Sequence, residues 1–110
     1  MRTYSEPASI SKNEFDDVIA SNNVKSKCDA IVRAVHSITD YRWLLTKFTG
    51  LLSDPEIQIR GVAITCIGHI ARLNSDADKQ ELIKILEPLL SDTSICGRVE
   101  DAMDDINMFL

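Results

Sequence analysis

The strongest structural signal in the sequence lies at residues 51–73, which read LLSDPEIQIRGVAITCIGHIARL. Asp54, Pro55 and Glu56 form a helix-start signal: an N-cap carboxylate, a proline at the first helical position, and an acid favoured by the helix dipole. Apolar residues then surround most of the helix circumference, which is typical of a helix packed on several sides. The sequence therefore predicts a helix over residues 55–73 at the centre of the core.

Two glycines interrupt this apolar helix. Gly61 and Gly68 each cost on the order of 1 kcal/mol relative to alanine inside a helix. Their separation of about two helical turns places them on one face. We expect a neighbouring helix to approach closely along that face.

Apolar residues at steps of three and four predict helices on both sides of this segment. One starts at Ser11, which has capping-box spacing with Glu14, and another follows Asp40 as its N-cap. The others are expected over residues 24–38, 76–90 and 94–109. Only Thr39 and Asp40 separate the helix over residues 24–38 from the next one, so these two are predicted to form an antiparallel hairpin. Pro88 is expected to kink the end of the helix over residues 76–90, because proline removes a helical hydrogen bond.

The length of 110 residues suits one domain over residues 1–110, with residues 1–10 as a flexible N-terminal tail. No apolar run is long enough to span a bilayer, and no signal segment is evident, so a cytoplasmic protein without membrane contact is expected. The three cysteines, Cys28, Cys66 and Cys96, have no CxxC spacing and fall at apolar helix positions. They are interpreted as buried reduced thiols.

The acidity is concentrated in the second half of the chain. Residues 1–53 carry seven basic and six acidic side chains, whereas residues 54–110 carry five and eleven. A net charge of -5 without a basic cluster is repelled by phosphate backbones, so direct nucleic-acid binding is not expected.

The string Leu-Leu-Ser-Asp occurs at residues 51–54 and again at 89–92. In both copies an isoleucine follows the Asp by three positions and an arginine by six. The first copy resembles the HEAT repeat, whose pattern runs Leu-Leu, Asp-Pro, Val-Arg, Ala, Ala-Leu-Gly. The resemblance implies an all-α, HEAT-like α-solenoid or helical hairpin bundle of five to six helices, with a structural repeat ladder formed by Asp54, Arg60, Asp92 and Arg98.

The sequence offers few groups for catalysis. His36 and His69 belong to no zinc-binding spacing, and no phosphate loop, nucleophile elbow or calcium loop is present. Cys66 and His69 lie three residues apart but have no evident further ligands. We therefore expect no enzymatic activity, no metal and no cofactor.

Two groups of residues are candidates for binding a partner. Glu100, Asp101, Asp104 and Asp105 form two like-charge pairs at i, i+4 near a helix C-terminus, where the dipole also disfavours them. They are either a solvated face or a docking surface for a basic partner. Tyr41, Arg42 and Trp43 are residue types enriched at interfaces, although Trp43 is alternatively expected to pack against the N-terminal helix.

A small acidic HEAT-like domain resembles bacterial toxin-immunity proteins of the contact-dependent inhibition type. The resemblance implies a non-catalytic protein that binds and neutralises a cognate toxin domain, expected to be a basic nuclease. The alternatives are a HEAT-repeat scaffold or adaptor domain and, among enzymes, a lyase-like HEAT protein that handles a small molecule. A lyase would need a large apolar pocket.

Overall fold

The computed structural model describes residues 8–110, and this range forms six α-helices and one 3-10 helix. In chain order they are α1 (Lys12–Ile19), α2 (Val24–Ser37), α3 (Tyr41–Leu51), α4 (Ile57–Leu73), α5 (Lys79–Leu86), η1 (Glu87–Ser91) and α6 (Cys96–Phe109). The described range is 75% helical and contains no strand. The predicted all-α fold is confirmed.

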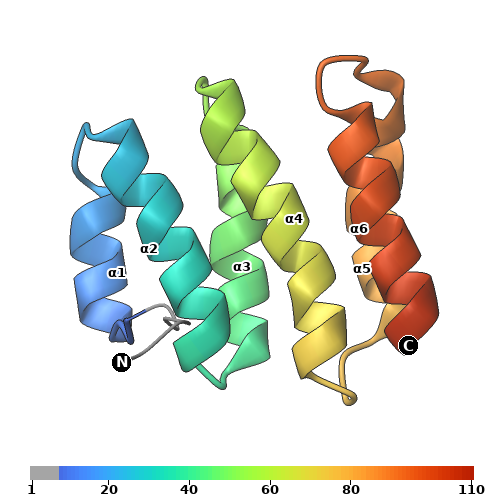
Figure 1. The fold of residues 1–110 in the computed structure, drawn as a ribbon, viewed down its shortest axis with the longest axis horizontal. Coiled ribbons are helices and arrows are strands. Elements are labelled where there is room, and N and C mark those ends of the chain that lie inside the picture. Colours follow the sequence, from blue (N-terminus) through green and yellow to red (C-terminus); the bar gives the residue numbers. More distant parts are fainter. Residues whose placement is uncertain (1–7) are drawn as a thin grey trace, which may run out of the picture.

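The helices are stacked side by side in two layers. In Figure 1, α2, α4 and α6 lie next to one another in front, with α3 and α5 behind them. The packing pairs α1 with α2, α3 with α4 and α5 with α6, and α4 also packs against both α2 and α6. The expected α2–α3 hairpin is joined by a short turn, but α2 makes its main contacts with α1 and α4.

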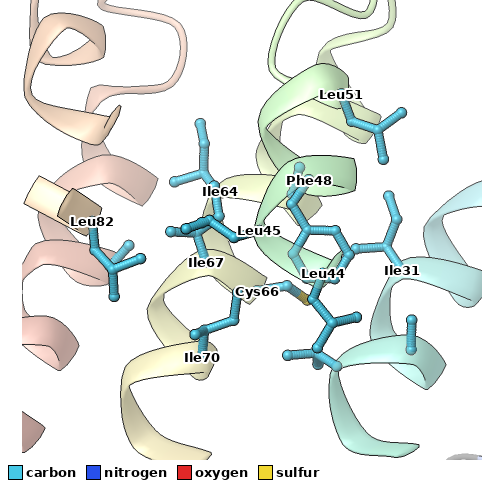
Figure 2. Close-up of a cluster of buried hydrophobic side chains, with 14 of the residues drawn as sticks. Ile31, Leu44, Leu45, Phe48, Leu51, Ile64, Cys66, Ile67, Ile70 and Leu82 are labelled. Atoms are coloured by element: carbon cyan, nitrogen blue, oxygen red, sulfur yellow. The ribbon is translucent and has the colours of Figure 1, made fainter. Parts of the chain in front are cut away.

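The core is centred on α4, as its all-round apolar pattern predicts. Ile64 and Ile67 are completely buried. Figure 2 shows Phe48 of α3 directed toward Ile31 of α2, and Leu82 of α5 on the other side of α4. One continuous hydrophobic cluster therefore joins residues from all six helices.

The two glycines of α4 both face α6, which confirms the expected close approach. A Cβ added at Gly68 would lie 3.0 Å from the Cα of Ala102, and one added at Gly61 would lie 2.7 Å from Nε of Arg98. The Arg98 side chain is flexible and can move, whereas the backbone at Ala102 cannot move without shifting α6. Gly68 therefore sets the distance between α4 and α6.

The starts of three helices differ from the predictions, and α5 begins at Lys79, after its N-cap Asp78, instead of at residue 76. The Asp54 carboxylate accepts a hydrogen bond from the Glu56 N–H at 2.9 Å, so it forms a tight turn just before the helix. As a result Glu56, and not Asp54, is the N-cap of α4, and Pro55 lies outside the helix. In the same way Asp92 binds Ser94, and α6 begins at Cys96 instead of Ser94.

The two predicted helix caps at Ser11 and Asp40 are confirmed. Ser11 and Glu14 form the expected capping box, and Asp40 caps α3 by accepting from the Trp43 N–H. Pro88 acts more strongly than a kink, since the α-helix ends at Leu86 and a 3-10 helix follows. Because proline has no N–H, the α-helical bonding pattern cannot continue through that turn.

The predicted tail of residues 1–10 falls partly outside the described residues, which exclude residues 1–7. Arg33 of α2 donates hydrogen bonds to the carbonyls of Ala8 and Ser9, at 3.0 and 2.8 Å. Ile10 is only 5% exposed and belongs to the hydrophobic core. The packed domain therefore includes the last part of the segment expected to be a tail.

The cysteines are free thiols, but only one of them is fully buried. Cys66 lies in the core, where burial raises its pKa to about 12, so the thiol is protonated and unreactive. Cys28 and Cys96 are half-buried, which corrects the expectation that all three are inside. Cys28 nevertheless packs against the hydrophobic core, as its apolar helix position predicts.

We expect Gly68→Ala to lower the free energy of unfolding by on the order of 1–3 kcal/mol, because its methyl group overpacks the contact with Ala102. Gly50→Ala is the matched control, since a Cβ at this α3 position meets nothing within 4 Å. Without a steric cost, alanine should raise stability by up to about 1 kcal/mol through helix propensity. Urea unfolding of both variants measures the difference, and stabilisation by Gly68→Ala would show that the α4–α6 contact is not tight.

Candidate partner-binding surfaces

Three of the four acids of the C-terminal helix are exposed on α6, and the fourth, Asp105, lies at the boundary with α4. This helix buries Val99, Ala102 and Ile106 against the rest of the domain. Glu100, Asp101 and Asp104 are exposed, and Asp105 is half-buried. None of these four carboxylates forms an ion pair with any residue in the range 8–110. The structure thus presents unneutralised negative charge along one helix.

The four residues predicted to form a repeat ladder make no ion pairs with one another within the described range. Arg60 donates to the main-chain carbonyls of Asp54 and Pro55, at 2.8 and 3.2 Å. Arg98 donates to the hydroxyl of Thr65 at 3.0 Å, and so ties α6 to α4. The Asp92 carboxylate binds Ser94, and this hydrogen bond lowers its pKa, with a smaller contribution from the charge of Arg60. These side chains fix turns and helix contacts, as scaffold residues do.

The predicted cluster of Tyr41, Arg42 and Trp43 is split between two sides of α3. Trp43 packs edge-on against Phe15 of α1, with ring centroids 5.4 Å apart, as its alternative interpretation expects. The ammonium groups of Lys12 and Lys47 lie 5.4 and 5.3 Å from the Trp43 ring centre. The indole is therefore engaged within the domain.

Arg42 and Tyr41 point instead toward α5. The Arg42 guanidinium donates to both carboxylate oxygens of Glu81 at 3.1 Å, and the charge of Glu81 raises the Arg42 pKa. The Tyr41 hydroxyl lies 3.3 Å from the carbonyl of Asp76. The Arg42–Glu81 pair spans a groove between α3 and α5, which is also lined by Leu45, Thr46, Thr49, Asp78, Gln80, Lys84 and Ile85.

A third surface, which the sequence did not single out, crosses the layer formed by α2, α4 and α6. We call it the histidine face, and it consists of His36, His69, Arg72, Leu73, Asp105 and Phe109. The rings of His36 and His69 have centroids 6.0 Å apart. The Arg72 guanidinium lies 5.8 Å from the centre of the Phe109 ring. Figure 1 shows that the C-terminal ends of α2, α4 and α6 lie at the same end of the layer.

His69 is the electrostatic centre of this face. Burial lowers its pKa, the charges of Arg72 and His36 lower it further, and Asp105 opposes them. The Nδ1 atom of His69 is buried and has no hydrogen-bond partner among the described residues. No pattern in the sequence marks this face. Its residues belong to three different helices, and they become neighbours only when these helices align in the fold.

The described residues include no cluster of three or more histidine, cysteine, aspartate or glutamate side chains suited to a metal ion. No helix between residues 8 and 110 combines the length and hydrophobicity needed to cross a membrane.

No protein-family model and no curated protein matches the sequence. The chain is similar to a chain in the crystal structure of a CDI complex from Cupriavidus taiwanensis, with 31% identity and a TM-score of 0.88. The match covers 99% of this chain and 98% of that chain. The protein thus belongs to a class of small all-helical domains that includes a component of a CDI complex. At this identity and coverage, the chain belongs to the same family as that component.

We expect stability to decrease as the pH falls from 7.5 to 5.5, with His69 as one cause. Its pKa is lowered in the folded state, so the unfolded chain takes up the proton more readily, near the ordinary pKa of about 6.5. His69→Gln should make the melting temperature less dependent on pH across this window. The lowered pKa values of Asp40 and Asp92 act only in more acidic solution. An unchanged pH slope in the variant would contradict the role of His69.

Proposed function

We propose that this protein is an immunity protein, which binds a toxin domain and neutralises it in the cytoplasm. The observation that carries the proposal is the full-length likeness to a component of a CDI complex. CDI denotes contact-dependent inhibition, in which a toxin is held inactive by its cognate immunity protein. Binding a protein partner is then the activity, and no chemistry by this chain is needed.

The charge distribution supports a basic partner, such as a nuclease domain. Glu100, Asp101 and Asp104 are exposed and unpaired, and the repulsion between neighbouring carboxylates costs roughly 0.2–0.5 kcal/mol per i, i+4 pair. A basic surface docked on α6 relieves this repulsion and attracts the partner over a distance. A nuclease must bind phosphates, so its active surface carries the complementary positive charge.

The proposed function is tested with the protein encoded by the gene immediately upstream, because a toxin gene directly precedes its immunity gene. The two purified proteins should form a stable complex in size-exclusion chromatography. Expression of the upstream protein alone should arrest bacterial growth, and co-expression of this chain should restore it. A chain that neither binds the upstream protein nor protects cells would refute the proposal.

We expect the double variant Asp101→Asn/Asp105→Asn to bind the same partner more weakly than wild type. The loss should lie mainly in the association rate, because exposed charges steer the encounter. It should also shrink as salt rises, since screening limits the reach of charges to about 8 Å at physiological ionic strength. Surface plasmon resonance at two salt concentrations measures both effects.

The matched control is Asp17→Asn/Glu56→Gln, which changes the net charge equally. Asp17 lies on α1, at the opposite end of the stack from α6, and both control side chains are exposed. The control should bind like wild type. If the two double variants have equal affinities at low salt, the acids of α6 serve solubility and not docking.

A further inference from the structure

The histidine face has the composition of an interaction surface. Leu73 and Phe109 are 52% and 47% exposed, although both are large apolar side chains. Both side chains lie next to Arg72. Arginine and aromatic residues often contribute much of the binding energy at protein interfaces. A depression next to Leu73, between the ends of α2 and α4, is lined by Val35, His36, Ser37, Ile38, Thr39 and Asn74. It offers an apolar side chain of a partner a place to insert.

The acids of α6 border this face. Asp105 lies close enough to His69 for its charge to act on the imidazole, and Asp101 is one helical turn away on the same side of α6. Carboxylates at the rim and an apolar centre together complement a basic protein surface that presents an apolar anchor. The same negative rim disfavours a nucleic acid or an acidic protein.

We propose that the histidine face, and not the groove between α3 and α5, is the surface on which the basic partner docks. The inference rests on the proposed immunity function and deepens it by naming the site. Arg72, Leu73 and Phe109 form the central contacts, and Asp101 and Asp105 hold basic groups of the partner at the edge. The depression beside Leu73 receives the apolar anchor.

The position of His69 between Arg72, His36 and Asp105 makes this contact sensitive to pH. The charged and titratable groups that act on His69 are Arg72 on its own helix, His36 on α2 and Asp105 on α6. Protonation of His69 adds a positive charge beside Arg72 and offsets the attraction of the neighbouring acids. A basic partner is then repelled, whereas an acidic partner would be held more tightly. The direction of the pH effect therefore reports the chemistry of the partner.

The site is tested by measuring the affinity for the protein encoded immediately upstream. Arg72→Ala and Phe109→Ala should each weaken binding by on the order of tenfold. The matched controls are Arg42→Ala in the groove between α3 and α5, and Leu90→Ala, which removes an exposed apolar side chain from η1. Both controls should bind like wild type. All four side chains are exposed or largely exposed, and circular dichroism confirms that each variant is folded.

A second measurement compares affinities at pH 7.5 and pH 5.5. Wild type should bind the basic partner more weakly at pH 5.5, by several-fold or more. His69→Gln should lose much of this pH dependence while keeping its affinity at pH 7.5 within a few-fold. Stronger binding of wild type at pH 5.5 would overturn the assignment of a basic partner to this face.

The outcomes separate this inference from the proposed function. If wild type does not bind the upstream protein, the immunity function fails and this site fails with it. If wild type binds and protects cells, but Arg72→Ala and Phe109→Ala leave the affinity unchanged, only the site is wrong. A selective loss in Arg42→Ala would instead place the interface in the groove between α3 and α5.

Discussion

The close contact between α4 and α6 is the constraint on which the arrangement of the other elements depends. Gly68 has no side chain, and the backbone of Ala102 occupies the space that a Cβ would need. This contact holds the last helix against the central helix at short range. It also places Asp105 beside His69, and Phe109 beside Arg72, so the same packing that completes the core creates the histidine face.

The sequence predicts those features that depend on local chemistry or on one helix at a time. The capping box of Ser11 and Glu14, the N-cap at Asp40 and the all-round apolar character of α4 are each contained in a short window, and each is observed. The start of α4 was misplaced because an Asp before a proline can cap a helix or close a tight turn with the same carboxylate. Asp54 forms the turn, and the sequence alone does not distinguish these two uses.

The candidate sites depend even more on information that a single stretch of sequence does not contain. The acids of α6 were recognised because all four lie within six consecutive positions of one helix. The histidine face was missed because His36, His69 and Phe109 lie on three different helices, and only the lateral alignment of these helices brings them together. Trp43 illustrates the reverse ambiguity, since its residue type is enriched at interfaces, but here the ring packs against Phe15, as its alternative interpretation expects. Residue type and helical spacing identify exposed or buried faces, but not which faces become neighbours.

The energetics of α6 explain how such a surface can exist on a small domain. The helix has no side-chain cap at its N-terminus and carries acids toward its C-terminus, so it would be marginal in isolation. Burial of Val99, Ala102 and Ile106 against the core compensates for these local costs. Because the inner face of α6 supplies the stability, the outer face is free to carry charges that folding alone would disfavour. The four carboxylates are thus not required by the packing of the core, and the proposed docking of a basic partner would give them a role that folding does not.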